Sequence, residues 1–121
     1  MPGQEVKMED CLFCKIANRE IESDIVYENE YVLVFKDINP AAPVHLLVIP
    51  KKHVSSIMEI DKFDGPEINE MMKAIKIMAK KIGLEKEGFR VVTNTGPGAG
   101  QSVGHLHFHI LGQRKFTWPP G

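Results

Sequence analysis

His105-Leu106-His107-Phe108-His109-Ile110-Leu111 is a stretch in which three of the chain's five histidines alternate with bulky apolar residues. Strict alternation has the period of a β-strand, so we expect the three imidazoles on one face and Leu106, Phe108 and Ile110 on the other. Imidazole can act as an acid, a base, a nucleophile or a metal ligand near neutral pH. The stretch therefore predicts a strand whose apolar face contacts a core and whose histidine face lines a site, rather than a solvated strand with chance histidines.

A glycine-rich segment lies directly before these histidines, with the sequence Asn94-Thr95-Gly96-Pro97-Gly98-Ala99-Gly100-Gln101-Ser102-Val103-Gly104. Glycine permits positive φ and a close approach of the backbone to a ligand, and successive backbone N–H groups in such a loop can hold an anion. Asn94 and Ser102 add side-chain donors. A glycine loop alone is more typical of a hairpin connection, but its place before three aligned histidines predicts a phosphate site.

The chain has 121 residues and a formal net charge of -1. Its length is that of one domain, which we place over residues 8–121, with residues 1–7 as a flexible N-terminal arm. The near balance of charge argues against a nucleic-acid partner held by bulk positive charge. The sequence contains no apolar run of membrane-spanning length and no apolar signal core, so we expect a cytoplasmic protein without a membrane partner.

Cys11 and Cys14 are the two cysteines of the chain, in the order Cys-Leu-Phe-Cys. In a reducing compartment this spacing is more typical of half a metal site or a redox pair than of a structural disulfide. A thioredoxin-like pair needs a preceding strand, whereas acidic residues precede this one. Half a zinc site needs two further ligands, which His45, His53 or the triad can supply. From the spacing alone, two buried free cysteines in the first turn of a helix explain the pair equally well.

The remaining patterns predict one short helix, one long helix and five strands. Asp10 is the expected N-cap of the short helix, over residues 11–18. Asp64 is the expected N-cap of the long helix, with Glu67 three residues later and Gly83 as the stop signal. Helical spacing predicts that the buried face of the long helix consists of Ile68, Met71, Met72, Ile75, Met78, Ala79 and Ile82. Strands are expected over residues 25–28, 31–35, 45–49, 89–93 and 105–111, which makes an antiparallel α+β domain.

The sequence resembles the histidine triad (HIT) superfamily, and within it the zinc-containing bacterial type of the Hint branch of nucleoside phosphoramidases. The family signature, His-φ-His-φ-His-φ-φ with φ apolar, is complete at residues 105–111. The resemblance extends from Cys11 onward and includes residues 45–53 and the Trp118-Pro119-Pro120-Gly121 end. It implies a HIT-like five-stranded antiparallel sheet with one long and one short helix, and a homodimer in which the sheet is continuous.

The resemblance also implies an activity, which is hydrolysis of the P–N bond in purine nucleoside phosphoramidates such as AMP joined to an amine or to lysine. His107, at the middle position of the triad, is then the nucleophile that forms a covalent nucleotidyl-histidine intermediate. Water releases the nucleoside monophosphate from it. Physical chemistry agrees, because an imidazole attacks phosphorus well when one nitrogen is free and the other is held as N–H by an acceptor.

By motif position, the resemblance assigns roles to the other site residues. His45 supports the histidine network, and His109 and Ser102 contact the phosphoryl group. Asp37 binds the ribose, although a turn-capping role explains an aspartate there equally simply. Further phosphate contacts are expected from Asn94, Gly100, Gln101, Ser102 and Val103, and base-pocket walls from Leu12, Phe13, Ile16, Ile38 and Leu47.

Members of the superfamily with a Cys-x-x-Cys pair carry a structural zinc. In those members the other two ligands match His53 and the first histidine of the triad. The resemblance thus implies one zinc per chain, held by Cys11, Cys14, His53 and His105. Two thiolates and two imidazoles make a closed tetrahedral site, which is the structural rather than the catalytic type.

Three other functions fit parts of the sequence. Hydrolysis of dinucleoside polyphosphates through the same nucleophile is the alternative inside the family. The second is a nucleotide-binding or sensor module with incidental activity, and turnover that depends on His107 would distinguish an enzyme from such a module. A catalytic metal held by His105, His107 and His109 together is the third. It is disfavoured, because the two outer residues lie about 13 Å apart along a strand.

Overall fold

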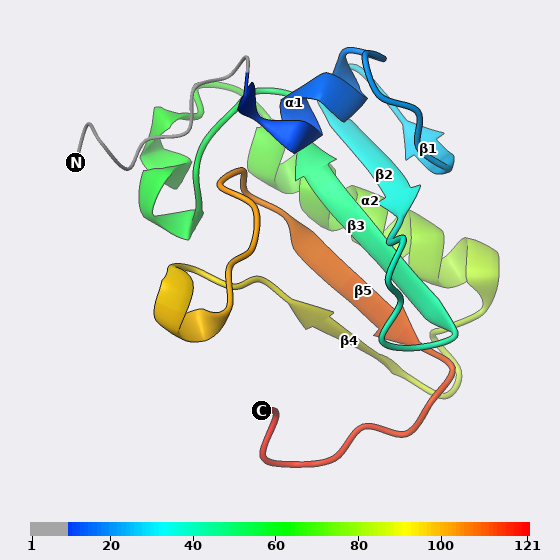
Figure 1. Ribbon diagram of the computed structural model, residues 1–121. Coiled ribbons are helices and arrows are strands. Elements are labelled where there is room, and N and C mark those ends of the chain that lie inside the picture. Colours follow the sequence, from blue (N-terminus) through cyan, green and yellow to red (C-terminus); the bar gives the residue numbers. More distant parts are fainter. Residues whose placement is uncertain (1–9) are drawn as a thin grey trace.

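The structure of the protein, a computed structural model, describes residues 10–121, and the expected arm over residues 1–7 lies outside the described residues. The centre is a five-stranded sheet in the order β1-β2-β3-β5-β4 (Figure 1). Its strands are β1 (Ile25–Glu28), β2 (Val32–Lys36), β3 (Val44–Pro50), β4 (Phe89–Val92) and β5 (Phe108–Gly112). All four neighbouring pairs are antiparallel, which confirms the predicted antiparallel α+β fold.

Two helices cover opposite faces of this sheet (Figure 1). The long helix is α2 (Glu67–Ile82) and the short one is α1 (Leu12–Ala17), as predicted. Short 3-10 segments, η3 (Ile57–Lys62) and η4 (Pro97–Ala99), lie in the connections. Within residues 10–121, no helix has the length and apolar character needed to cross a membrane.

Alternation along the central strands sends side chains toward both helices. Val32 and Val34 of β2 pack in the core beneath α2, whereas Leu33 and Phe35 pack in the core beneath α1. The neighbouring strand β3 divides its side chains in the same way. Full burial of such a side chain stabilises the fold by about 1.5–3 kcal/mol, so the central strands hold both layers together.

The long helix begins at Glu67, and the prediction that Asp64 caps it is wrong. Pro66 occupies the N-cap position without a side-chain hydrogen bond. The reason is steric, because the residue before a proline, here Gly65, is disfavoured in helical backbone geometry and therefore does not start the helix. The end of α2 is as predicted, since Gly83 follows it with a φ of 82°.

The buried face of α2 differs from the predicted one at Met72, which is 41% exposed. A helix turns by about 100° per residue, so Met72 lies off the stripe that its neighbour Met71 occupies. Ile68 and Ile82 pack against the core as partly buried residues. The fully buried apolar positions follow the spacing i, i+3, i+4, i+7, i+8 and are Met71, Ala74, Ile75, Met78 and Ala79.

The short helix is capped by Cys11, and the prediction of an Asp10 cap is wrong. The backbone of Cys11 is extended, with φ −83° and ψ 117°, and its Sγ accepts the N–H of Cys14 at 3.4 Å. The thiol therefore takes the role that we assigned to the carboxylate, and the helix starts one residue later than predicted.

The histidine stretch keeps its predicted alternation, although its first part is not a strand. β5 begins at Phe108 rather than His105, because the backbone before it leaves the sheet: the N–H of Leu106 donates to the carbonyl O of Val54 at 2.8 Å. Leu106 and Ile110 are buried beneath α2, and Phe108 packs against them. The three histidines consequently lie on the α1 side of the sheet.

Candidate functional site

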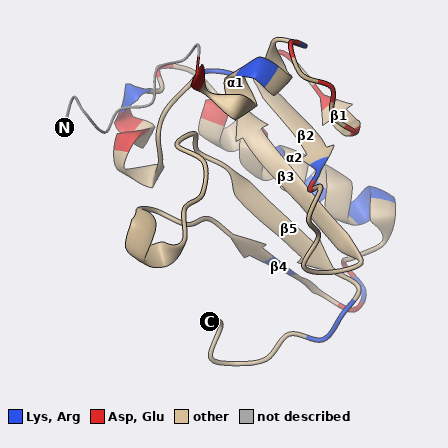
Figure 2. Ribbon diagram, viewed as in Figure 1, with Lys and Arg blue, Asp and Glu red and all other residues tan. Residues whose placement is uncertain are grey.

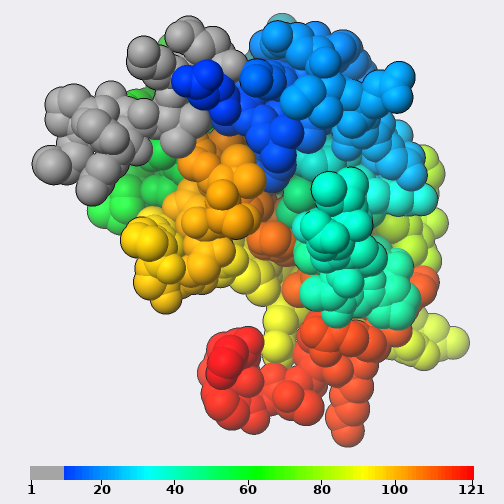
Figure 3. Space-filling view, in the orientation of Figure 1, coloured from blue at the N-terminus to red at the C-terminus, as the bar shows by residue number. Residues whose placement is uncertain are grey.

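A pocket of about 270 Å³ opens on the α1 side of the sheet, over the histidine stretch. Figure 3 shows the surface hollowed between the glycine segment (residues 94–104), α1 and the β2–β3 connection. Residues predicted for the nucleotide site form most of its wall, namely Leu12, Phe13, Ile16, Asp37, Ile38, Leu47, Ser102, Val103, His107 and His109. No motif marks the other wall residues, which sequence reasoning missed: Ile21, Glu22, Ser23, Phe35, Lys36 and Asn39.

Three residues expected to contact phosphate do not line this pocket: Asn94, Gly100 and Gln101. The side chain of Gln101 is used inside the glycine segment. Its Oε1 accepts the N–H of Gly96 at 2.9 Å, and its Nε2 donates to the carbonyl O of Ser55 at 2.7 Å. Gly96 and Gly100 have φ of 85° and 84°, a conformation that favours glycine. The shape of the loop therefore depends on its glycines and on Gln101.

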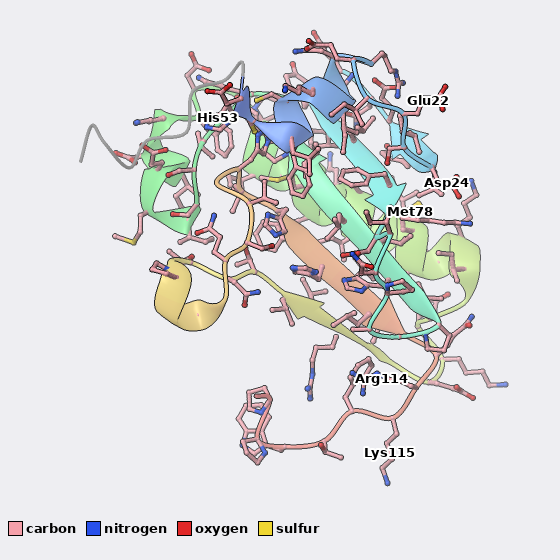
Figure 4. The ribbon with its side chains drawn as sticks, viewed as in Figure 1. Glu22, Asp24, His53, Met78, Arg114 and Lys115 are labelled. Atoms are coloured by element: carbon pink, nitrogen blue, oxygen red, sulfur yellow. The ribbon has the colours of Figure 1, made fainter. Side chains whose placement is uncertain are left out.

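The four predicted metal ligands converge at the start of the histidine stretch. Sγ of Cys11 lies 3.3 Å from Nδ1 of His105, and Sγ of Cys14 lies 3.3 Å from Nδ1 of His53. Figure 4 shows His53 beside the beginning of α1. All four ligand atoms lie within 4.8 Å of one another, a spacing that zinc–ligand bonds of about 2.0–2.3 Å can bridge.

The hydrogen bonds of this cluster also fit a metal. Nε2 of His105 donates to the carbonyl O of Pro50 at 2.9 Å, so the lone pair on Nδ1 of His105 faces the sulfurs. Burial, together with hydrogen bonding to Cys11 and the charges of Cys11 and Glu20, raises the pKa of the Cys14 thiol to about 12. A thiolate in this place therefore needs a cation beside it. Two sulfurs and two imidazole nitrogens fit one closed, structural zinc site.

His107 lines the pocket with its two ring nitrogens in different roles. Its Nδ1 lies 2.7 Å from the carbonyl O of His105, and a carbonyl only accepts, so Nδ1 carries the proton. Burial lowers the pKa of His107, against the opposing effects of that hydrogen bond and of Asp37, so the ring is neutral near pH 7. The Nε2 atom therefore keeps a free lone pair, which is what a nucleophilic imidazole needs.

His45 and His109 form a hydrogen-bonded pair whose protons can be assigned in the same way. The N–H of Ala41 donates to Nδ1 of His45 at 2.9 Å, which places the proton of a neutral His45 on Nε2. That Nε2 lies 2.8 Å from Nδ1 of His109 and 3.4 Å from Oδ2 of Asp37. His45 thus donates to His109, and His109 carries its own proton on Nε2.

Burial keeps this pair neutral near pH 7. It lowers the pKa of His109 to about 4, with the neighbouring His107 and His45 lowering it and Asp37 opposing them. Burial also lowers the pKa of His45, again against Asp37. His109 lines the pocket, so the site contains a neutral imidazole with a free lone pair, His107, beside a neutral imidazole N–H donor, His109.

The wall that carries the glycine segment and the histidines has no formal charge. The chain contains no Asp, Glu, Lys or Arg between Arg90 and Arg114, and Figure 2 shows the glycine segment and β5 without coloured residues. An anion against this wall is held by dipoles, from backbone N–H groups, the His109 ring and the Ser102 hydroxyl. Phosphoryl transfer depends mainly on such positioned donors, so the arrangement suits attack on a phosphorus atom.

The chain is similar over most of its length to known proteins. Residues 18–116 match the family model of the HIT domain. The 14 kDa zinc-binding protein of Zea mays is 45% identical over 112 residues, which cover 91% of this chain and 87% of that protein. The crystal structure of a HIT family hydrolase from Legionella pneumophila Philadelphia 1 has a TM-score of 0.88 and 46% identity, covering 92% and 99% of the two chains. A hypothetical histidine triad nucleotide-binding protein from Sulfolobus tokodaii strain7 has a TM-score of 0.75 and 38% identity, covering 90% and 72%.

Proposed function

Because this chain belongs to the HIT domain family, whose solved members include a protein named a hydrolase, we propose that it hydrolyses purine nucleoside phosphoramidates. It cleaves the P–N bond between AMP and an amine, the lysine amine included, and releases AMP. One observation carries this proposal. The bond from Nδ1–H of His107 to the carbonyl O of His105, at 2.7 Å, leaves Nε2 of His107 free in the pocket that Asp37, Ser102 and His109 also line.

In the first step, the Nε2 lone pair of His107 forms a bond to phosphorus and the P–N bond of the substrate breaks. The leaving nitrogen keeps the electron pair of that bond and takes a proton from a water molecule at the open side of the pocket. The product is a nucleotidyl-histidine whose ring is positively charged. Its Nδ1–H still donates to the His105 carbonyl, and this charge-assisted hydrogen bond stabilises the cation.

In the second step, water attacks the same phosphorus atom. The Nε2–P bond breaks, its electron pair returns to His107, and the proton lost by water goes to the solvent. The lowered pKa of His107 favours return of the ring to the neutral form. Splitting one difficult displacement into two through a covalent intermediate is the general advantage of nucleophilic catalysis.

The non-bridging oxygens of the phosphoryl group are bound by hydrogen-bond donors. These donors are Nε2–H of His109, the Ser102 hydroxyl and the backbone N–H groups of Ser102 and Val103, which line the pocket. The N–H groups of Gly100 and Gln101 instead donate to the carbonyl oxygens of Pro97 and Gly96, which shapes the loop. The His109 donor is held in place by His45, and the loop is held by Gln101. Donors that are already oriented need no reorganisation as charge develops.

The nucleoside occupies the other end of the pocket. Asp37 has one carboxylate oxygen that accepts the N–H of Asn39 at 2.8 Å and another that lies 3.4 Å from Nε2 of His45. A carboxylate has further lone pairs that can accept two ribose hydroxyls. Ile38, which is 89% exposed, gains apolar cover when a purine stacks over it. The other apolar walls are Leu12, Phe13, Ile16 and Leu47.

The zinc site supports this chemistry from outside the pocket. The Cys11, Cys14, His53 and His105 cluster fits one structural zinc, and a relative is named a zinc-binding protein. Zinc supplies a cross-link between the start of α1 and the backbone before β5, and with four protein ligands it leaves no position for substrate. His105 is thereby held so that its carbonyl keeps orienting His107.

We further propose that the active form is a cytoplasmic homodimer built from the domain of residues 8–121. β4 is an edge strand of the sheet, and Val91 on this strand is 40% exposed. An edge strand has unpaired backbone groups that can pair with another chain. Pairing of β4 with β4 of a second copy extends the sheet across both protomers.

Hydrolysis of adenosine 5′-phosphoramidate tests the function, with the metal content measured on the same samples. We expect turnover by the parent protein, none by His107→Ala or His107→Gly, and about one zinc per chain in all three, as a structural site predicts. If the parent protein binds AMP but does not hydrolyse the phosphoramidate, the result favours the sensor module. Faster cleavage of diadenosine polyphosphates than of the phosphoramidate assigns the chain to the dinucleotide-cleaving alternative.

A further inference from the structure

Arg114, in the C-terminal tail, is connected to the histidine pair through the backbone of one residue, Ala41. Arg114 Nε donates to the carbonyl O of Ala41 at 3.0 Å, and the N–H of Ala41 donates to Nδ1 of His45 at 2.9 Å. We propose that Arg114 is a positioning residue that fixes the ring tautomers of His45 and His109 by holding Ala41. The expected effect of Arg114 on turnover rests on the proposed function, whereas its effect on the histidine tautomers does not.

The guanidinium of Arg114 is itself held in place. It stacks over the ring of Phe116, with 4.2 Å from Cζ to the ring centroid, and it donates to the carbonyl O of Lys115 at 3.3 Å. Arginine combines stacking and directed hydrogen bonding in one rigid plane, which lysine does not. Figure 4 shows Arg114 and Lys115 in the tail that follows β5, with the Lys115 side chain pointing away from the sheet.

Ala41 needs such an anchor because it lies in an exposed connection. Residues 38–41 between β2 and β3 are exposed, whereas His45, the second residue of β3, is buried. The carbonyl and the N–H of Ala41 flank the same Cα, so a side chain that holds the carbonyl also limits the direction of the N–H. Arg114 therefore aims the Ala41 N–H at His45 from outside the pocket.

The direction of this N–H decides which nitrogen of His45 carries the proton. With Nδ1 accepting from Ala41, the proton sits on Nε2 and is donated to Nδ1 of His109, 2.8 Å away. His109 then presents Nε2–H to the phosphoryl oxygens. If Ala41 moves, His45 can carry its proton on Nδ1 instead. The unprotonated Nε2 of His45 then accepts from Nδ1 of His109, so the proton of His109 moves from its Nε2 to its Nδ1. The phosphoryl group loses its imidazole donor, although every histidine is still present.

Ring-nitrogen NMR of 15N-labelled histidines tests the inference without reference to activity. Pyrrole-type and pyridine-type nitrogens have distinct shifts, so the tautomers of His45 and His109 can be read directly. We expect Nε2–H on both rings in the parent and in Lys115→Ala, the matched control, and mixed tautomers on both rings in Arg114→Ala and Arg114→Lys. Ala41→Pro, which lacks the N–H, should resemble Arg114→Ala, and Ala41→Gly should resemble the parent.

Steady-state kinetics on the same proteins supply the second readout. Loss of one oriented donor should lower kcat on the order of tenfold to a hundredfold in Arg114→Ala, with KM for the phosphoramidate changed by less than about twofold. Parent tautomers in the spectrum of Arg114→Ala would overturn the inference, whatever the rate. A parent protein with the expected tautomers but no turnover would instead contradict the proposed function and still support the role of Arg114 in fixing the tautomers.

Discussion

The carbonyl oxygen of His105 accepts the Nδ1–H of His107 at 2.7 Å, while the ring of His105 belongs to the Cys and His cluster that fits zinc. One residue thus connects the metal site to the nucleophile through its own backbone. The metal site can influence catalysis in this way without contact between zinc and substrate.

Removal of zinc should therefore reduce both stability and turnover. Structural zinc contributes its binding energy to folding, and a loss of about 3 kcal/mol lowers the Tm of a chain of this size by roughly 10 °C. Calorimetry and phosphoramidate hydrolysis before and after chelation measure the two effects. Added zinc should restore both, and Cys14→Ser should resemble the chelated protein. Full activity in a zinc-free protein would show that the metal site is not needed to orient His107.

The acid limb of the pH profile should lie below the ordinary titration range of histidine. Burial lowers the pKa of His107 and lowers that of His109 to about 4. Protonation of His107 removes the lone pair on Nε2, so kcat/KM should fall as the pH falls through the lowered pKa of His107 and not near pH 6.5. A profile of kcat/KM from pH 4 to 8 measures it. An inflection at pH 6.5 or above would contradict a neutral, buried nucleophile.

Phe13→Ala should be strongly destabilising. The Phe13 ring is 4% exposed and meets the rings of Phe35 and His107 edge-on, at 5.4 and 5.0 Å between centroids. Truncation of a buried phenylalanine costs about 3–5 kcal/mol. Leu12→Ala on the same helix is the control, because Leu12 is 43% exposed and should cost less than about 1 kcal/mol. Denaturant unfolding compares them, and equal losses would show that Phe13 is not part of the core.

Gln101→Ala should slow turnover without contact between Gln101 and substrate. The Gln101 amide bonds Gly96, Ser55 and Val103, which fixes the glycine segment. Displaced backbone donors should reduce kcat on the order of tenfold to a hundredfold. Gln113→Asn, an amide change in the exposed tail, should leave kcat unchanged. Parent-like kcat in Gln101→Ala would mean that the loop keeps its shape without this clamp.

The period of the histidine stretch predicted the site better than it predicted the secondary structure. Alternation correctly places Leu106 and Ile110 in the core and His107 in the pocket, because side-chain direction needs only an extended backbone. A β-strand also needs a neighbouring strand to pair with, and the N–H of Leu106 donates to the carbonyl O of Val54 instead of to such a strand. For this reason the predicted strand is too long at its beginning.

The hydrogen bonds that assign the ring protons could not be predicted from sequence. They are made by the backbone N–H of Ala41 and by the backbone carbonyls of Pro50 and His105. Every residue type except proline offers the same two backbone groups, so no pattern of side chains marks these three. Their positions depend on how distant segments pack together.

Trapping of the covalent intermediate tests the central proposal most directly. The protein is mixed with an adenosine 5′-phosphoramidate, quenched within one turnover in alkaline denaturant, digested and examined by mass spectrometry. We expect an adenylyl group on His107 in the parent protein and none on any peptide of His107→Ala. Turnover by the parent without an adduct, or an adduct on another residue, would contradict a mechanism in which His107 is the nucleophile.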